Sequence, residues 1–376
     1  MKELLEGSKA IAKAVAACRP AVVSAYPITP QTHIVENLAE MKANGEIDLE
    51  FIRAESEFAA ASIVQGASLA GVRSYTASAS QGLLLMTEVL FSIAGMRLPV
   101  VLTCANRAVS SPINIWNDQQ DAMTIRDAGW VMFFAEDLQE AVDMHILAFY
   151  IAESLNLPVM VNMDGFYLTH AAEIVDLPEV ERVNFFLPSF KPKEFLDPGN
   201  PRTFGFLSDP EIYEALRLDL HRAISGSLGK ILDAINEFVR VFGRVPFGLI
   251  EKYKTEDAEI LVIAMGSIVG TLKEAVDELR QRGVRAGVLK ISSFRPFPEK
   301  EILDAILKTQ SYTPDLAPKI IVLDRAISLG SEGILAAEIK NVLFNNKVNL
   351  GVKSEVVGLG GKDITVGELK EIIEEV

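Results

Sequence analysis

One carboxylate, Glu57, lies at the start of a helix that carries no charged side chain from Phe58 to Val72. Such a helix offers water few hydrogen-bonding groups, so we expect it to be buried. At its N-terminus the helix dipole favours the carboxylate anion, whereas desolvation favours the neutral acid. A carboxyl group between these two effects is suited to exchanging a proton with a partner. The alternative is that Glu57 is an ordinary N-terminal helix acid, which is a common feature.

Two further polar residues follow predicted strands. Thr29 lies in the turn after the first strand, and Arg107 lies in the loop after the strand at 98–103. Ligands of doubly wound sheets bind at the carboxyl ends of the strands, so we expect Thr29, Glu57 and Arg107 to converge there. A guanidinium and a hydroxyl together suit a small carboxylate. The alternatives are a loop salt bridge for Arg107 and a helix cap for Thr29.

The first half of the chain alternates strand-like and helical patterns, which predicts a parallel sheet wrapped by helices. The expected strands are 21–25, 49–53, 73–77, 98–103, 130–134 and 158–162. The expected helices are 4–17, 32–43, one that begins near Ser56 and Glu57 and contains 58–72, a buried helix that ends at Gly95, and 138–155. Pro27 and Pro30 exclude both helix and sheet pairing from the turn between the first strand and the second helix.

A second α/β unit follows a Pro-rich stretch. Residues 170–204 lose the alternating pattern and contain four prolines from Pro188 to Pro201, which is typical of a linker or an arm on another subunit. Helical periodicity returns from Pro210 to about Val241, with an apolar face that we expect to face the core. We predict an α/β fold with a doubly wound domain at 1–245 and a smaller domain at 256–376. In the smaller domain we expect strands near 258–265, 286–291, 320–323 and 354–357 and helices at 271–282, 299–307, 332–342 and 366–374.

Composition narrows the class of protein. The 376 residues, 49% of them hydrophobic, are enough for about two domains with sizeable cores. The net charge of −15, with no basic cluster, argues against a nucleic-acid partner. The sequence has no apolar run of membrane-spanning length, and its first residues do not resemble a secretory leader. We therefore expect a cytoplasmic protein with no membrane association.

The potential metal ligands show no metal-binding spacing. Cys18 and Cys104 are far apart and form no CxxC pair, so we expect no iron–sulfur cluster and no structural zinc in this chain. The four histidines show no ligand spacing either, and we predict ordinary surface or packing roles for them. They are His33, His145, His170 and His221. No metal is assigned to this chain.

Several strings taken together resemble a known family. AYPITPQT, SEFAAASIVQGASLAG, TASASQGLLLM, ANRAV with NDQQD, and MDGF occur in this order, followed by FRPFP, LDR and GLGGKD. These strings and their order resemble those of the α subunit of the 2-oxoacid:ferredoxin oxidoreductases. The resemblance covers essentially the whole chain. The resemblance implies a domain that binds the pyrimidine of thiamine diphosphate and a smaller domain similar to the C-terminal domain of transketolase.

The resemblance also implies roles for individual residues. Glu57 corresponds to the glutamate that exchanges a proton with N1′ of the cofactor's aminopyrimidine. Thr29 and Arg107 match the contacts to the substrate carboxylate. Pro27, Ile28 and Gln81 are expected to contact the cofactor. The implied reaction converts a 2-oxoacid, coenzyme A and oxidised ferredoxin to acyl-CoA, carbon dioxide and reduced ferredoxin, reversibly. Pyruvate is the expected substrate, with 2-oxoisovalerate and 2-oxoglutarate as alternatives.

The resemblance further implies partner subunits. A β subunit would hold the diphosphate and its Mg²⁺, and [4Fe-4S] clusters in partner subunits, among β, γ and δ, would pass electrons to ferredoxin. Asp164-Gly165 could be mistaken for a diphosphate motif, but the string reads MDG and no Asn pair follows. We therefore expect this chain to be inactive alone. The alternative from another class of protein is a non-catalytic scaffold subunit that has kept the fold.

Overall fold

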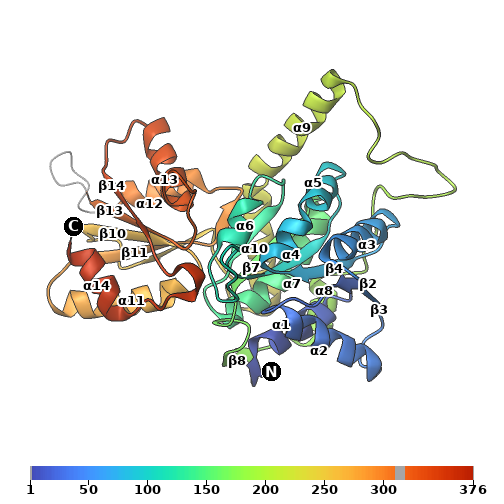
Figure 1. The fold of residues 1–376 in the computed structure, drawn as a ribbon, viewed down its shortest axis with the longest axis horizontal. Coiled ribbons are helices and arrows are strands. Elements are labelled where there is room, and N and C mark those ends of the chain that lie inside the picture. Colours follow the sequence, from blue (N-terminus) through green and yellow to red (C-terminus); the bar gives the residue numbers. More distant parts are fainter. Residues whose placement is uncertain (1, 310–317, 376) are drawn as a thin grey trace.

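The computed structural model describes residues 2–309 and 318–375, and in these residues the chain forms two large sheets. Figure 1 shows the N-terminal half, in blue to green, around a seven-stranded sheet. The C-terminal part, in orange to red, surrounds a five-stranded sheet beside it. The fold is therefore α/β throughout, as the sequence predicts.

The seven-stranded sheet has the order β12-β6-β7-β5-β4-β2-β3, and all its neighbours are parallel except β12 and β6. Its strands are β2 (Val22–Ala25), β3 (Glu50–Arg53), β4 (Ser74–Ser78), β5 (Val101–Asn106), β6 (Val131–Phe134), β7 (Val159–Asp164) and β12 (Ser293–Arg295). Every residue of β4 to β7 is buried, because helices cover both faces of a parallel sheet.

The direction of each connection between parallel strands determines which face of the seven-stranded sheet its helix covers. The chain passes outward from β2 to β3 and then back to β4, so right-handed connections put the intervening helices α2 and α3 on opposite faces. One layer contains α1 (Gly7–Ala17), α2 (Thr32–Ala43) and α7 (Leu138–Leu155). The other contains α3 (Glu57–Leu69), α4 (Ser80–Leu85), α5 (Thr87–Gly95) and α6 (Gln120–Thr124).

The five-stranded sheet has the order β14-β13-β10-β11-β9, with only β9 antiparallel to its neighbour. Its strands are β9 (Ile250–Tyr253), β10 (Ile260–Ala264), β11 (Ala286–Ile291), β13 (Lys319–Asp324) and β14 (Val352–Val356). Its helices are α11 (Ile268–Gln281), α12 (Glu299–Leu307), α13 (Ile334–Asn345) and α14 (Val366–Glu374), with the short η1 (Leu359–Gly361) before α14. The strands and helices predicted for this unit are confirmed, whereas β9 and β12 were not predicted.

Two predictions about the N-terminal domain are wrong in detail. Residues Lys2–Glu6 form strand β1, which pairs antiparallel with β8 (Ala172–Asp176), so the first helix begins at Gly7 and not at residue 4. Pairing with a distant strand overrides the local helix preference. Helix α3 is buried along only one side, since Phe58 is 40% exposed. The absence of charge on α3 therefore does not mean burial within this chain.

The segment 170–242 contains more helices and strands than the sequence predicts. A smaller part of its helical region faces the core than predicted. Besides β8, it contains α8 (Val180–Phe186), α9 (Pro210–Ser225) and α10 (Leu228–Phe242). Helix α10 packs its apolar face inward, as predicted, but α9 projects from the body, and Leu220 is its only buried residue (Figure 1). The prediction that the whole helical region faces the core is wrong for α9, where Tyr213 is 61% exposed.

The two sheets are joined by pairing and by buried charge. Strand β12, which follows β11 in sequence, leaves the second sheet and pairs with β6 of the first. Lys290, at the end of β11, is buried against Glu140 (2.8 Å) and Glu136 (2.9 Å) of the first domain. Such a pair holds two surfaces in one register because either charge alone would be costly to bury. Among the described helices, none combines the length and the low polarity that crossing a bilayer requires.

Candidate active site

The three predicted residues follow neighbouring strands of the seven-stranded sheet. Thr29 follows β2, Glu57 follows β3, and Arg107 follows β5, with β4 between β2 and β5. These strands are parallel, so all three residues lie at the same edge. The chain order reverses at β2, whose neighbours are β3 and β4, and ligands of doubly wound sheets bind at such a reversal.

Arg107 and Thr29 are in direct contact. The Nη1 of Arg107 donates to the backbone carbonyl of Thr29 (3.0 Å), and its Nε donates to the carbonyl of Asn114 (2.9 Å). Its Nη2 makes no hydrogen bond with any described residue, and the guanidinium pairs with no carboxylate among them. A loop salt bridge therefore does not explain Arg107, and the whole Nη2 amino group remains for a ligand. Burial lowers the pKa of Arg107, and the negative charge of Asp121 opposes this shift.

Thr29 does not cap the following helix. The N-cap residue of α2 is Gln31, which makes no side-chain cap bond, and Thr29 itself is exposed beside the turn. The turn is anchored underneath by Gln31, whose amide oxygen accepts from the Ile28 N–H (3.2 Å) and whose amide nitrogen donates to the carbonyl of Ala77 (2.9 Å). Gln31 is buried, so it fixes the turn against the end of β4, while Thr29 remains exposed.

A buried carboxylate ties the strand ends together. Asp121 accepts from the backbone N–H groups of Ser80 (2.9 Å) and Arg107 (3.0 Å) and from the side chain of Asn106 (3.0 Å). Burial raises its pKa, and these hydrogen bonds oppose the increase. Asp121 therefore sets the path of the loops after β4 and β5. Sequence reasoning missed this role, although the residue lies in the NDQQD string.

Glu57 lies against the first turn of α4. It is 7% exposed, and a Cβ added at Gly82 would be 2.6 Å from its Oε1 and 2.7 Å from the Ser78 hydroxyl oxygen. Only glycine at position 82 leaves room for this carboxyl group. The hydroxyl oxygens of Ser78 and Thr76 are buried and have no partner among the described residues. Buried hydroxyls without partners near a buried carboxyl group are compatible with a polar ligand at this position.

The other three predicted contact residues lie along the same edge. Pro27 and Ile28 are half-buried in the turn before Thr29, and Gln81 is half-buried in the first turn of α4. The side-chain oxygen of Gln81 contacts the Ser80 hydroxyl. The structure therefore places all six predicted residues on one edge, although no contact joins Glu57 to Thr29 or Arg107.

The second domain holds the loop that carries Arg107. Asn114 donates from its side chain to the carbonyl of Gly360 (3.0 Å), and Asp118 accepts from the Gly360 N–H (3.0 Å). The Gly361 N–H donates to the carbonyl of Asn117 (2.6 Å). Burial raises the pKa of Asp118 to about 6. The GLGGKD string of the second domain thus positions the Arg107 loop, a role that the sequence alone did not indicate.

Asp164 of the MDG string is committed to the domain interface. Its carboxylate, 1% exposed, pairs with Arg325 (3.0 Å) and accepts from the N–H (2.8 Å) and hydroxyl (2.5 Å) of Ser267. Gln119 donates to its other oxygen (3.3 Å). These partners occupy the carboxylate, which supports the interpretation that Asp164 is not a diphosphate-site ligand.

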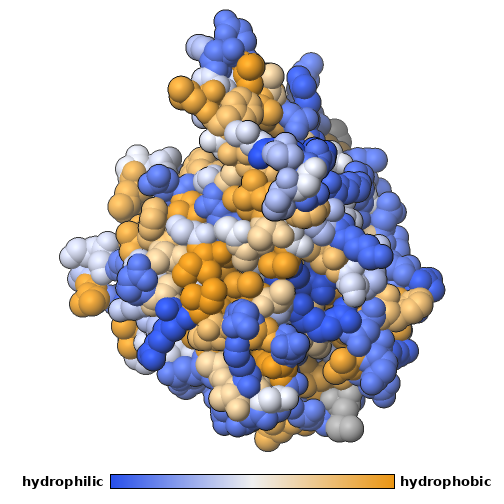
Figure 2. Space-filling model, turned by 90° about the vertical axis from the view of Figure 1, so that its right-hand side faces the viewer, coloured by the Kyte–Doolittle hydropathy of each residue, from blue (hydrophilic) through white to orange (hydrophobic). Residues whose placement is uncertain are grey.

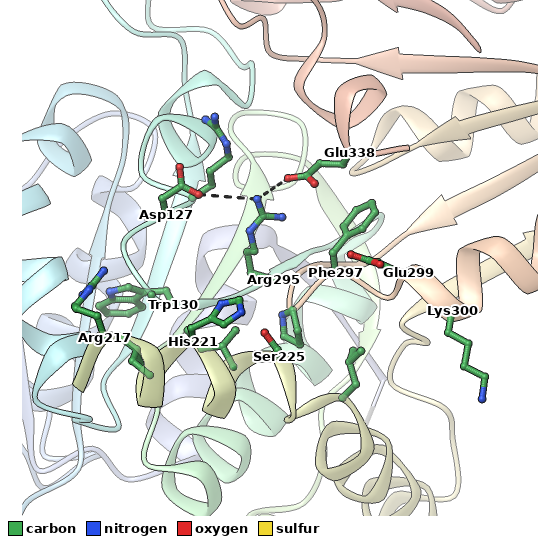
Figure 3. Close-up of a pocket in the computed structure, with 16 residues that line it drawn as sticks. Asp127, Trp130, Arg217, His221, Ser225, Arg295, Phe297, Glu299, Lys300 and Glu338 are labelled. Atoms are coloured by element: carbon green, nitrogen blue, oxygen red, sulfur yellow. Dashed lines mark hydrogen bonds and ion pairs between the residues drawn. The ribbon is translucent and has the colours of Figure 1, made fainter. Parts of the chain in front are cut away.

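A cavity of about 560 Å³ lies away from this edge, between α9 and the second domain (Figure 3). Arg295 extends across it and pairs with Glu338 (2.5 Å) and Asp127 (4.0 Å). None of the six predicted site residues lines this cavity. The strand-end site and this cavity are therefore separate features.

Comparison with known families matches both parts of the chain. Residues 13–228 match the model described as pyruvate flavodoxin/ferredoxin oxidoreductase, thiamine diphosphate-binding. Residues 258–369 match the model described as pyruvate:ferredoxin oxidoreductase core domain II. The first range contains all six predicted site residues, and the second contains the Gly360 turn.

Named relatives align over nearly the whole chain. Pyruvate synthase subunit PorA of Methanosarcina barkeri is 49% identical over 99% of this chain and 92% of its own length. The same subunit of Methanothermobacter thermautotrophicus is 44% identical over 99% of this chain and 94% of its own length. Ketoisovalerate oxidoreductase subunit VorA of Pyrococcus abyssi is 43% identical over 100% of this chain and 93% of its own length.

Solved structures share the fold at low sequence identity. A 2-oxoglutarate:ferredoxin oxidoreductase from Magnetococcus marinus aligns with a TM-score of 0.74 at 20% identity, covering all of this chain and 65% of its own. A split-gene transketolase aligns with a TM-score of 0.57 at 14% identity. The alignment covers 99% of this chain and 97% of the transketolase chain. These likenesses support the arrangement of the two domains.

Proposed function

The chain belongs to the 2-oxoacid:ferredoxin oxidoreductases as an α subunit, and from this premise we propose that it binds the pyrimidine of thiamine diphosphate and orients pyruvate for oxidative decarboxylation. The observation that carries the proposal is the contact between Arg107 and the Thr29 turn, at the same sheet edge as Glu57. The overall reaction would convert pyruvate, coenzyme A and oxidised ferredoxin to acetyl-CoA, carbon dioxide and reduced ferredoxin.

The residues around Glu57 fit the pyrimidine end of the cofactor. Gly82 leaves room for the carboxyl group itself, and the unpaired hydroxyls of Ser78 and Thr76 offer further polar contacts. When bound, thiamine diphosphate supplies the nucleophilic carbon and the electron sink for decarboxylation. Glu57 would hold or release a proton at N1′ of the aminopyrimidine, which is general acid–base catalysis by a positioned carboxyl group. Pro27, Ile28 and Gln81 would line the same cofactor.

Arg107 and Thr29 would orient the substrate carboxylate. The Nη2 of Arg107 has no partner among the described residues, and Thr29, whose backbone carbonyl contacts Arg107, is exposed. A charge-assisted bond from Arg together with a directional hydroxyl bond fixes a small carboxylate in one orientation. Orienting the acid in this way brings its oxo carbon to the cofactor, and good orientation lowers the barrier to a bimolecular step.

Partner subunits would complete the site. Several apolar side chains near Glu57 are exposed on α3, α4, α5 and the neighbouring strand ends; they are Tyr26, Ile52, Phe58, Leu85 and Phe91. Figure 2 shows a broad hydrophobic area on the face of the molecule that includes α3 and α5. An exposed area of this kind marks a protein interface. We assign it to the β subunit, which would bring the diphosphate and Mg²⁺, while [4Fe-4S] clusters in partner subunits, among β, γ and δ, would pass electrons to ferredoxin.

The substrate is tested on the intact complex under anaerobic conditions. Coenzyme-A-dependent reduction of a low-potential acceptor is measured with pyruvate, 2-oxoisovalerate and 2-oxoglutarate in parallel. We expect the highest kcat/KM with pyruvate. A preference for 2-oxoisovalerate, the substrate class named for the VorA relative, would replace pyruvate and leave the chemistry unchanged. Failure of all three acids in a complex without thiamine diphosphate would favour a scaffold subunit.

Asn114 offers a test of how the second domain positions Arg107. Asn114→Ala removes the bonds to the Gly360 carbonyl and the Trp116 N–H but keeps the backbone carbonyl that binds Arg107. Two hydrogen bonds contribute about 1–2 kcal/mol together, so we expect KM for the oxoacid to rise about 5- to 30-fold with a smaller change in kcat.

The control is Asn345→Ala, an exposed asparagine in the second domain that bonds only within α13. Steady-state kinetics of the two variants in the complex separate the effects. An unchanged KM in Asn114→Ala would show that the Gly360 contact does not position Arg107.

A further inference from the structure

The fold brings two histidines and a glutamate together from three distant segments. Glu6 ends β1, His33 is the second residue of α2, and His170 lies in the loop between β7 and β8. One potential ligand atom from each lies within 4.8 Å of the others. The Nδ1 of His33 is 2.7 Å from Oε1 of Glu6, and the two imidazole rings are 4.8 Å apart between centroids. No spacing in the sequence indicated this cluster.

A hydrogen bond to a buried threonine fixes the ring of His170. Its Nδ1 is 2.7 Å from the Thr169 hydroxyl, which also accepts from the Phe166 N–H (2.8 Å). A ligand histidine usually bonds through its second nitrogen in this way, which fixes the ring and leaves the other nitrogen for the metal. Thr169 is fully buried, so this support is part of the protein interior.

The backbone around Glu6 is equally fixed. The Gly7 N–H donates to the Ala171 carbonyl (3.0 Å), and both the N–H (2.8 Å) and the hydroxyl (2.9 Å) of Ser8 donate to the Thr169 carbonyl. A Cβ at Gly7 would be 1.7 Å from the Leu168 carbonyl oxygen, so only glycine permits this approach. Glu6 and His170 therefore stay adjacent, while His33 and Glu6 are partly exposed and can adjust by the ångström that coordination requires.

We propose that Glu6, His33 and His170 bind one divalent transition-metal ion, with zinc as the best fit. Two imidazole nitrogens and one carboxylate oxygen are a common zinc ligand set, and the fourth position would hold water. Burial lowers the pKa of His170, the neighbouring His33 adds to this effect, and the negative charge of Glu6 opposes it. Because α2 begins just after the Thr29 turn, the ion would tie that turn to the loop after β7.

Zinc binding is measured on the intact complex. After passage over a chelating resin, the complex is incubated with ZnCl₂ and desalted, and the retained zinc is determined by elemental mass spectrometry. We expect the wild type to retain one more zinc per α chain than His33→Ala or His170→Ala. His221→Ala, which removes an exposed histidine of α9, should retain as much zinc as the wild type.

Thermal denaturation gives a second readout. Zinc should raise the melting temperature of the wild type and of His221→Ala and leave that of His33→Ala unchanged, because a ligand stabilises only the state that binds it. His33 is partly exposed, so this variant should fold even where His170→Ala does not. Equal zinc retention in the wild type and His33→Ala, or zinc lost on desalting from both, would overturn the proposal.

Discussion

Replacing Glu57 by Gln is expected to lower the kcat of the complex by at least about 100-fold, because positioned acid–base groups contribute roughly 100- to 10,000-fold. The amide keeps the size of the side chain, so Gly82 still leaves room for it. It cannot exchange a proton with N1′ of the cofactor. The measurement is coenzyme-A-dependent acceptor reduction, made together with the thiamine diphosphate content of each preparation.

Glu55→Gln is the matched control for this variant. Glu55 lies two residues earlier on the same segment and is exposed, so its replacement should leave the rate unchanged. Retained thiamine diphosphate in Glu57→Gln would show that the loss lies in the chemical step and not in assembly. Full activity of Glu57→Gln in an intact complex would contradict the proposed role and favour the scaffold alternative.

The sequence was sufficient to predict that Thr29, Glu57 and Arg107 lie at one edge of the sheet. Each of Thr29, Glu57 and Arg107 follows a predicted strand, and parallel strands place their carboxyl ends at one edge whatever the details of the loops. The structure confirms this placement and the main helices and strands of both domains. The prediction succeeded because hydrophobic periodicity depends on neighbours that are close in sequence.

The residues that hold the site together could not be found in the same way. Asp121 and Asn114 act through hydrogen bonds to backbone groups, and the partners of such bonds depend on the path of each loop. The cluster of Glu6, His33 and His170 arises because β1 pairs with β8, more than 160 residues away. Contacts of this range leave no periodic signal in the sequence.

Helix α3 shows a second limit of prediction from the sequence, which concerns burial. Its lack of charge predicts burial, but Phe58 and Gly66 are exposed in the single chain. A sequence records the surroundings of a residue in the assembled protein, and it does not distinguish burial within a chain from burial against a partner. The mismatch between composition and exposure is therefore itself evidence for a subunit interface beside Glu57.

Asp164→Ala is expected to have the largest effect on stability. It leaves Arg325 buried without its carboxylate and removes the acceptor for both donors of Ser267. Removing one member of a buried ion pair costs about 3–5 kcal/mol, which for a chain of this size lowers the melting temperature by roughly 4–6 °C. The measurement is a thermal melt of the anaerobic complex. Glu259→Ala breaks the exposed pair with Arg285. It should change the free energy of unfolding by no more than about 1 kcal/mol.

The double variant Asp164→Ala with Arg325→Met distinguishes an unpaired charge from a lost contact. Methionine fills much of the space of the arginine stem without a charge, so the double variant should be more stable than Asp164→Ala alone. Hydrogen exchange should increase in both variants at the Gly360 turn and in the Arg107 loop, since the same interface holds them. Equal stability of the wild type and Asp164→Ala would mean that the other contacts between the two domains, among them β12 and the Lys290 pairs, hold them together without Asp164.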